Sequence, residues 1–444
     1  MIRPEQLTRY TGTVRKFFVQ NFGCRATQAD GAALESLLGQ RGMEPSGERA
    51  HAELVVLNSC TVTAAADDDL RQTVRRVHRE NPDARILVTG CYAQRAPDEI
   101  AALPGVVWVV GNSDKTAIPD LVTDELGHFH GQIHVHDIFA QHEFLSAPVE
   151  DAAGDRARPN LKIQDGCNNR CSFCVIPFVR GRSRSMAAEQ VLEQVRGLSR
   201  NYREVVLSGV NLGRWGREPG STMRLAGLVK RLLDETPVER LRLSSVEPMD
   251  FTDELLGLMA ESKRIAKHVH APLQSGSDTV LRRMHRKYRP RHYADRLEKA
   301  RAWMPDAAIG ADVMAGFPGE SEAEFEETYQ FIDSLPFTYL HVFTYSARPG
   351  RPAATAPMQV PMPVRKERNR RLRELAERKN AAFRLGFVGG SVSVVTLGQG
   401  KMALSSNYLK VELLRESVDN VLRDVRIGGL SELGLREYDP LRVL

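Results

Sequence analysis

The sequence lacks any long apolar run. Nowhere in its 444 residues does a stretch approach the roughly 18 apolar residues that cross a bilayer. Residues 1–18 carry charged and polar side chains throughout, without the apolar centre that a secretory signal needs. These two absences predict a cytosolic protein, located in the cytoplasm and without a membrane partner.

Cysteine is scarce, and neither sign of charge dominates. Six thiols in a long chain without a signal peptide favour reduced cysteines and metal ligation over a disulfide framework. The chain has 61 Lys and Arg against 56 Asp and Glu, and this net charge of +5 permits a nucleic-acid partner without requiring one. An apolar content of 42% and a length of 444 residues predict two or three folded domains.

Three of the cysteines, Cys167, Cys171 and Cys174, have CxxxCxxC spacing directly after the alternating apolar stretch 161–164. Thiolates are the ligands of iron-sulfur clusters, and three of them hold three irons of a cubane, leaving one iron open. An open position is typical of a catalytic metal site, because substrate can bind there. A zinc knot is the alternative, but zinc needs four ligands, and no further Cys or His lies within about ten residues.

The first third of the chain alternates strand-like and helix-like patterns. Strands are expected at 17–21, 54–58, 85–89 and 106–110, and helices at 30–41, 67–80, 97–103 and 114–122. This βαβ series predicts a parallel sheet that ends near residue 126.

The other three cysteines, Cys24, Cys60 and Cys91, each lie within about three residues of the C-terminal end of one predicted strand. A lone cysteine is more often a small buried apolar residue than a ligand. The carboxyl ends of parallel strands share one edge, however, so three thiols at equivalent turns should converge. Each turn also opens a helix, whose N-terminal dipole favours the thiolate. Two sets of three cysteines therefore predict two clusters, each with an open iron.

The CxxxCxxC loop resembles the S-adenosylmethionine (SAM) loop of the radical SAM superfamily. This resemblance implies that the amino and carboxylate groups of SAM chelate the open iron. It also implies that Phe173, the aromatic residue before the third cysteine, lies against the adenine.

A flavodoxin-like domain with three cysteines, followed by a radical SAM barrel, is similar to the methylthiotransferase family. The segments 58–63, Asn-Ser-Cys-Thr-Val-Thr, and 89–94, Thr-Gly-Cys-Tyr-Ala-Gln, most resemble the branch that acts on N6-threonylcarbamoyladenosine in tRNA, beside the anticodon. After Cys24 that branch usually reads Lys-Val-Asn, whereas this chain reads Arg25-Ala26-Thr27.

The resemblance implies two [4Fe-4S] clusters with different tasks. The cluster on Cys167, Cys171 and Cys174 would reduce SAM to a 5′-deoxyadenosyl radical that abstracts hydrogen from C2 of the modified adenine. The cluster on the other three cysteines would carry the sulfur, which a second SAM methylates. An electron donor and a sulfur source are further expected partners, and the sequence identifies neither of them, nor a general base.

Residues 159–384 show six βα units. Strands are expected at 161–164, 204–207, 240–244, 268–272, 308–313 and 339–344, and helices at 187–200, 223–235, 252–261, 291–303 and 322–335. This pattern predicts an open, incomplete (β/α) barrel with its active site at the C-terminal ends of the strands.

Polar and glycine-rich motifs follow four of these strands. Any one of them could be only a βα turn. Glycine lets backbone amides approach a ligand closely, and a few placed polar groups suit a small-molecule pocket. The resemblance implies SAM contacts at five of these positions, namely Gly209, Ser245, Glu247, Gln274 and Gly316.

The remaining segments concern connection and RNA binding. Residues 127–158 are expected to be a linker, in which His134 and His136 are solvated connector residues more readily than metal ligands.

The basic stretches 282–301 and 365–384 suit a solvated helix face and an RNA-facing surface about equally. The tail, 385–444, has β-rich runs at 391–396, 409–413 and 421–427, which predict a small barrel; the family has an RNA-binding TRAM domain at this place.

The sequence therefore predicts a three-domain α/β radical enzyme with a tRNA substrate. One alternative is a methylthiotransferase of another branch, which modifies isopentenyladenosine in tRNA or an aspartate of a ribosomal protein. Another is a non-catalytic iron-sulfur RNA-binding sensor, which would need no SAM pocket. The motifs after the barrel strands argue against the sensor.

Overall fold

Residues 16–134 form a six-stranded parallel sheet in the computed structural model, which describes residues 9–10, 14–123, 128–141, 158–398 and 400–440. Its order is β3-β2-β4-β5-β6-β8. The strands in that order are Glu44–Pro45, Lys16–Asn21, Leu54–Ser59, Arg85–Gly90, Val106–Val110 and Gln132–His134. Strands β4, β5 and β6 are apolar along nearly their whole length because both faces of the sheet are covered.

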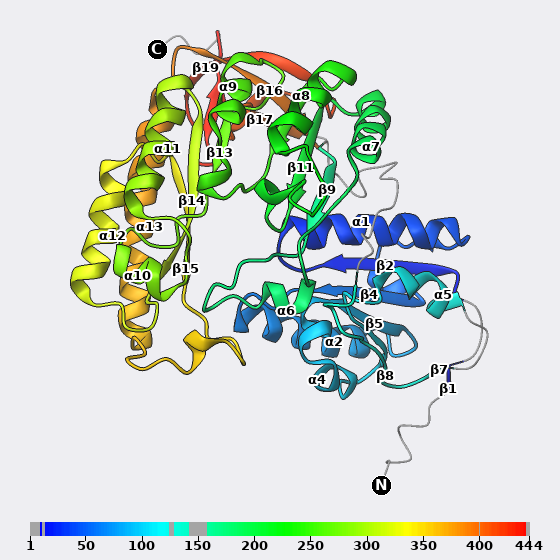
Figure 1. Ribbon diagram of the computed structural model, residues 1–444. Coiled ribbons are helices and arrows are strands. Elements are labelled where there is room, and N and C mark those ends of the chain that lie inside the picture. The colour runs from blue at the N-terminus through cyan, green and yellow to red at the C-terminus, as the bar shows by residue number, and fades with distance from the viewer. Residues whose placement is uncertain (1–8, 11–13, 124–127, 142–157, 399, 441–444) are drawn as a thin grey trace.

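Helices cover both faces of this sheet (Figure 1). They are α1 (Arg25–Gln40), α2 (Ala64–Glu80), α3 (Cys91–Arg95), α4 (Pro97–Ala101), η3 (Lys115–Ala117) and α5 (Ile118–Thr123). One apolar cluster joins alternate sheet residues to α2 and α4, and another joins the residues between them to α1 and α5. The predicted flavodoxin-like arrangement of this domain is confirmed.

The sheet extends into the stretch expected to be a linker. Strand β8 pairs in parallel with β6, so the expectation that the sheet ends near residue 126 is wrong. Without β8, the buried strand β6 would form an edge with unpaired backbone groups. Nearby, β1 (Arg9–Tyr10) pairs with β7 (His128–Phe129). His136, just after β8, is exposed and bonds Asp114 at 2.6 Å, whereas His142 falls outside the described residues.

The six expected barrel strands are all present, divided between two sheets. One has the order β10-β9-β11-β12, formed by Arg184–Ser185, Asn160–Asp165, Glu204–Gly209 and Arg240–Leu243. The other is β13-β14-β15, formed by His268–His270, Ala308–Ala315 and Tyr339–Thr344. The two sheets are linked by the isolated bridge Leu241 to Ile265 and by a hydrogen bond from the N–H of Val246 to the carbonyl oxygen of His270, at 3.0 Å, rather than by a continuous ladder. The barrel is therefore open, as predicted, and consists of two halves (Figure 1).

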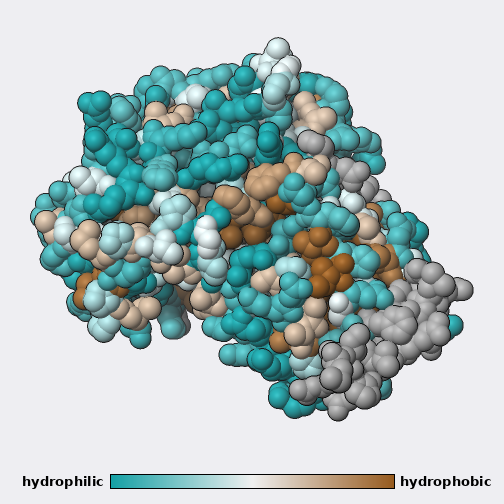
Figure 2. Space-filling view, turned by 60° about the horizontal axis from the view of Figure 1, so that its bottom comes forward, coloured by the Kyte–Doolittle hydropathy of each residue, from teal (hydrophilic) through white to brown (hydrophobic). Residues whose placement is uncertain are grey.

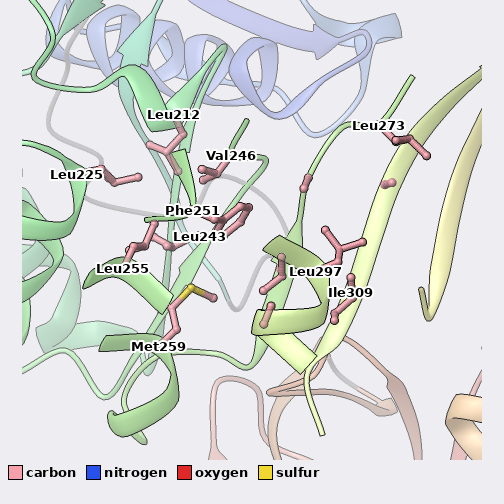
Figure 3. Packing of buried hydrophobic residues seen from close by; sticks show 14 of the residues in the cluster. Leu212, Leu225, Leu243, Val246, Phe251, Leu255, Met259, Leu273, Leu297 and Ile309 are labelled. Atoms are coloured by element: carbon pink, nitrogen blue, oxygen red, sulfur yellow. The ribbon is translucent and has the colours of Figure 1, made fainter. Parts of the chain in front are cut away.

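Helices α7 (Ala188–Asn201), α8 (Leu225–Glu235), α9 (Asp253–Glu261), α10 (Asp278–Arg283), α11 (Pro290–Trp303) and α12 (Glu322–Ser334) form the outer layer of the partial barrel, with short turns η4 (Leu212–Arg214), η5 (Pro248–Asp250) and η6 (Pro352–Ala354). The short helix α6 (Ile176–Arg180) lies instead against α3 of the N-terminal domain. A single apolar core joins both halves: Figure 3 shows Leu243 and Phe251 of one half and Leu297 and Ile309 of the other. Buried packing thus replaces the missing backbone bonds between the sheets.

The tail is a closed five-stranded barrel, which confirms the prediction from its β-rich runs. Its strands, in barrel order, are β16 (Ser391–Leu397), β17 (Gly400–Ser405), β18 (Lys410–Ser417), β20 (Leu435–Glu437) and β19 (Leu422–Leu430). The 24-residue helix α13 (Met362–Leu385) leads into it.

The tail barrel covers the N-terminal end of the partial barrel. Arg242 of β12 donates hydrogen bonds to the carbonyl oxygens of Ser405 and Ser406, at 3.0 and 3.1 Å. His268, at the start of β13, stacks on Tyr408 with ring centroids 4.4 Å apart. The C-terminal ends of the barrel strands, where the active site is expected, are not covered by the described residues of the tail barrel. Of the helices in the described ranges, none is both long and apolar enough to span a membrane.

Candidate functional site

The loop with Cys167, Cys171 and Cys174 follows β9 at the C-terminal end of the partial barrel. Ser172, in the middle of this loop, fixes it to the other half. Its backbone N–H donates to the carbonyl oxygen of Met284 at 3.1 Å, and its hydroxyl donates to that of Arg283 at 2.8 Å. The loop therefore depends on both halves of the barrel for its position.

The three thiols of this loop converge. Burial, followed by the charge of Cys171 and then that of Cys167, raises the pKa of the Cys174 thiol to about 12. Asn211 donates to the sulfur of Cys167 at 3.7 Å, and Arg286 donates to that of Cys171 at 3.3 Å. Three partly buried thiols held by neighbouring donors fit three irons of a cubane. Because ligation requires thiolates, loading this site would release protons.

Arg286 connects the cysteine loop to a predicted SAM residue. Its guanidinium donates two bonds to Glu247, at 2.9 and 3.0 Å, in addition to its bond to Cys171. Its Nε also donates to the hydroxyl of Tyr288 at 3.2 Å, which in turn bonds the carbonyl oxygen of Leu273. Sequence reasoning placed Arg286 only in a basic stretch; here it is buried and positions the loop against the ends of the strands.

The glycines predicted to contact SAM lie at close backbone approaches. A Cβ on Gly209, at the end of β11, would lie 2.9 Å from atoms of Gln164 in β9. Gly316 has φ +75°, and a Cβ there would lie 2.3 Å from the side chain of Arg365 in α13. Packing inside the protein therefore already requires glycine at both positions. Their role toward SAM stays a prediction.

The other predicted SAM residues lie around the same end of the barrel. Phe173 contacts Phe317 edge to face, with ring centroids 6.3 Å apart. Gln274 has a left-handed backbone, φ +67°, which its N–H bond to Asp312 and the bond that its carbonyl oxygen accepts from Met314 stabilise. Ser245 follows β12 and is partly buried. These residues come from different strands, as a shared pocket requires.

Cys24, Cys60 and Cys91 converge at the edge of the N-terminal sheet. Cys24 is the N-cap of α1, Cys60 follows β4, and Cys91 opens α3. Gly23 has φ +89°, and a Cβ there would lie 2.7 Å from the sulfur of Cys60. Burial, then the charges of Cys91 and Cys24, raise the pKa of the Cys60 thiol to about 12. Three thiols at neighbouring strand ends that interact electrostatically suit a metal cluster better than three separate core positions.

Where the related branch has Lys-Val-Asn after the first cysteine, Thr27 stabilises the turn. Its hydroxyl lies 2.6 Å from the carbonyl oxygen of Cys24 and 2.8 Å from that of Phe22. The backbone of Thr27 is in turn fixed by Asn58, which donates to its carbonyl oxygen at 2.7 Å. Thr27, which stands where that branch has Asn, therefore still fixes the turn that contains Cys24.

One short helix joins the two sets of thiols. Helix α6 starts two residues after Cys174, and Val175 and Val179 pack directly on Cys91. Asn112 of the N-terminal domain donates to the sulfur of Cys91 at 3.6 Å and to the carbonyl oxygen of Val179 at 2.7 Å. With five residues at 1.5 Å each, the helix is about 7.5 Å long, so Cys91 lies close in space to the end of the loop that contains Cys174.

Arg180, the last residue of α6, brings a buried positive charge to the N-terminal thiols. Burial disfavours this charge, but Asp165, Cys91 and Asp30 together raise the pKa of the Arg180 guanidinium well above its ordinary value. A guanidinium beside thiolates favours their ionised, ligating form. Nothing in the local sequence indicated this role.

Apolar side chains are partly exposed on α6 and on β15. Figure 2 shows one face of the molecule, where hydrophobic residues gather near the middle with mostly hydrophilic residues around them. Phe178 of α6 and Phe343 of β15 are exposed to 36% and 49%.

The two basic stretches are mainly structural. In 365–384, Arg368 pairs with Glu320 at 2.9 Å, and Arg371 pairs with Glu326 at 2.8 Å, which fixes α13 to α12. In 282–301, Arg286 and Arg296 also pair with carboxylates. Many Arg side chains of these stretches are therefore paired with carboxylates of the same chain, which leaves fewer of them to face RNA.

Comparisons with known proteins agree with this geometry. Residues 161–332 match the model of the Radical SAM superfamily, and residues 16–111 match that of Uncharacterized protein family UPF0004. Among solved structures, the radical S-adenosylmethionine methyltransferase TsrM of Kitasatospora setae has a TM-score of 0.55 at 15% identity, with 77% of each chain covered. At that identity the likeness concerns the fold.

Curated relatives match over most of the chain. A protein of Bacillus subtilis named threonylcarbamoyladenosine tRNA methylthiotransferase MtaB is 42% identical, over 80% of this chain and 79% of its own. Its namesake in Aquifex aeolicus is 35% identical over 93% and 99%. A tRNA-2-methylthio-N(6)-dimethylallyladenosine synthase of Erythrobacter litoralis is 33% identical over 97% and 96%. With two converging sets of thiols on the matching domains, the chain belongs to the tRNA methylthiotransferase family of radical SAM enzymes.

Proposed function

We propose that the protein adds a methylthio group to C2 of N6-threonylcarbamoyladenosine in tRNA, beside the anticodon. The observation that carries this proposal is the position of α6, which follows the loop of one set of three thiols and packs on Cys91 of the other set. A reaction that both activates a C–H bond and delivers sulfur to it needs two such sites within reach of one base.

Each set of thiols would hold one [4Fe-4S] cluster, and SAM would bind at the cluster of the partial barrel. When bound, these groups supply the radical, the sulfur and the methyl group, which is chemistry that protein side chains cannot perform. The chain itself binds, orients and shields them. Phe173, Gly209, Ser245, Glu247, Gln274 and Gly316 would surround SAM, and Arg286 would hold Glu247 and Cys171 in fixed relation.

The domains would divide the work. The N-terminal domain, extended by β8 beyond residue 126, would present the sulfur. The partial barrel with α13 would hold SAM, and the closed tail barrel would bind tRNA, as small barrels of this kind bind nucleic acids through a strand face and loops. An electron donor and a sulfur source would come from the cytoplasm.

The choice of adenosine rests on the names of the relatives. MtaB names lead the matches, which supports threonylcarbamoyladenosine. A second candidate is dimethylallyladenosine, because a synthase of that type matches 97% of this chain at 33% identity. The two substrates differ only in the group on N6, so mass distinguishes them.

The test is nucleoside mass spectrometry of tRNA from a strain without the gene, and from the same strain complemented by wild type or by a variant. Wild type should restore methylthio-threonylcarbamoyladenosine. A variant with Cys167→Ala, Cys171→Ala and Cys174→Ala should not, whereas Lys230→Ala, an exposed change on α8, should. Restored methylthio-dimethylallyladenosine would favour the second candidate, and restoration of neither product would contradict both.

A further inference from the structure

The inner face of β13, β14 and β15 carries a polar cluster that contains none of the six cysteines. Along β14, Ile309, Ala311, Val313 and Ala315 lie in the apolar core with the helices. Because successive side chains of a strand point to opposite faces, Asp312 points into the partial barrel. Its direct neighbour across β15 is His341, and His270 comes from β13 on the other side.

Three donor atoms meet there. His270 Nε2 and His341 Nδ1 each lie 3.2 Å from the same carboxylate oxygen, Oδ1 of Asp312. All three donor atoms lie within 4.8 Å of one another, and the two imidazole rings have centroids 5.2 Å apart. Tyr339 contacts the His270 ring edge to face at 5.8 Å, which limits its rotation.

These distances are at the long end of the range for a hydrogen bond. A charge-assisted N–H···O bond has a length of about 2.7 to 2.9 Å. The His136–Asp114 pair of this chain is that close, at 2.6 Å. By contrast, two ligands that each lie about 2.1 Å from one tetrahedral or octahedral ion are about 3.0 to 3.4 Å apart. The two separations of 3.2 Å fall in that range.

We propose that His270, Asp312 and His341 bind one divalent transition-metal ion, a third metal site that contains no thiolate. Two imidazoles and one carboxylate suit Mn²⁺, Fe²⁺ or Zn²⁺ rather than Mg²⁺ or Ca²⁺, which prefer oxygen ligands alone. Three protein ligands leave positions open for water or another oxygen donor. The side chains of His341 and Asp312 are 47% and 26% exposed, so an ion can enter from the interior of the open barrel.

The proposal does not depend on which base the enzyme modifies. Its first consequence is mechanical, because the ion would join all three strands of one half-barrel. Its second is chemical, since an open coordination position would bind water or another oxygen donor beside the three strands.

The test is titration of the iron-loaded full chain with Mn²⁺, followed by the six-line electron paramagnetic resonance signal of the free ion. Mn²⁺ is the suitable probe because it prefers nitrogen and oxygen ligands over thiolates. Wild type should take up about one Mn²⁺ per chain, and Zn²⁺ should displace it, since Zn²⁺ binds such sites more tightly. Asp312→Asn and His341→Ala should each weaken uptake at least about tenfold, because even the loss of an outer partner costs that much.

His136→Ala is the matched control, since it removes the imidazole of the ordinary pair and should leave uptake unchanged. Iron content, measured on every variant, shows whether the protein is folded and keeps its clusters. His341 is half-exposed, so its replacement keeps the test valid if Asp312→Asn does not fold. Wild type that takes up neither Mn²⁺ nor Zn²⁺, or folded variants that take up as much as wild type, would overturn the site.

Discussion

Arg180 lies 2.9 Å from Asp30 and 3.0 Å from Asp165, and thereby joins α1 of the N-terminal domain to the partial barrel. Lys115 and Lys162 complete this buried group of charges. Burial alone would raise the pKa of Asp30, but Lys115, Lys162 and Arg180 hold it well below its ordinary value. The relative position of the two sets of thiols thus depends on a few charges with no access to water.

Replacing Arg180 with Met should destabilise the protein by roughly 3–5 kcal/mol, because it leaves buried carboxylates without a partner. It should also lower the iron bound by Cys24, Cys60 and Cys91, whose thiolates lose a neighbouring positive charge. Urea unfolding and iron analysis measure both effects. Arg196→Met, which removes an exposed pair with Glu235, should cost at most about 1 kcal/mol. Equal stability of the two variants would contradict this account.

Acid should weaken the contact between the partial barrel and the tail. Burial disfavours the charge of Glu204, but Arg242 and Arg158 lower its pKa to about 2 from an ordinary value of 4.5. A lowered folded-state pKa gives stability that is complete above about pH 4.5 and lost as the pH falls toward 2. Glu204→Gln should therefore reduce stability at neutral pH by on the order of 3 kcal/mol and flatten the acid dependence.

Unfolding midpoints between neutral pH and pH 3 measure this difference. Glu235→Gln, which changes an exposed carboxylate, is the control. A Glu204→Gln protein whose midpoint falls with acid as steeply as wild type would assign the effect to other groups.

Iron content tests the presence of two clusters. Anaerobically reconstituted wild type should hold about eight irons, twice the four of one cubane. Replacing Cys167, Cys171 and Cys174 with Ala should leave about half, as should replacing the other three cysteines. If the iron content of a triple variant is unchanged, the three cysteines replaced in it are not iron ligands.

The two sets of thiols should be separable in activity. A Cys24, Cys60, Cys91 triple Ala variant should still cleave SAM to 5′-deoxyadenosine, because the Ser172 and Arg286 contacts of the other loop remain. It should form no methylthio product. Chromatography of the nucleosides measures both outcomes. If cleavage disappears from a variant that keeps four irons, the tasks are not divided in this way.

Exposed cations of the tail should contribute to tRNA binding. Lys401→Glu with Arg415→Glu should weaken affinity and reduce its dependence on salt, by roughly one logarithmic unit of slope for each phosphate that is no longer bound. Arg196→Glu with Lys230→Glu, on α7 and α8, is a control of equal charge. Equally weakened binding in both variants would indicate a general effect of net charge. Charge reversal is preferable to deletion, because Arg242 and His268 bind the tail to the partial barrel.

The elements with strong local signals were predictable from the sequence. The strands 106–110 and 339–344 have the bounds that their β-rich runs indicate, and Cys24, Cys60 and Cys91 lie at the ends of neighbouring parallel strands. Short elements were missed. Strand β8 has three residues and α6 has five, and tertiary contacts, rather than propensity, stabilise both.

The supporting residues of the site could not be predicted for a different reason. Arg180 and Asp30 are 150 positions apart, and His270 and Asp312 are 42 apart, so no sequence window contains either pair. Charged residues also occur everywhere on a surface, and only burial distinguishes Arg286 from its neighbours in the same basic stretch. Which charged residues pair across such distances in the sequence is decided only by the complete fold.

The contact between Arg348 and Asp67 has a consequence for synthesis on the ribosome. The guanidinium of Arg348 donates a hydrogen bond to the carboxylate of Asp67, in α2, at 2.8 Å, and the two residues are 281 positions apart in the sequence. At about 5–20 residues per second, Arg348 is made about 15–60 s after Asp67. Until then the carboxylate of Asp67 lacks this partner, so this contact between the N-terminal domain and the end of the partial barrel forms only after most of the chain has been made.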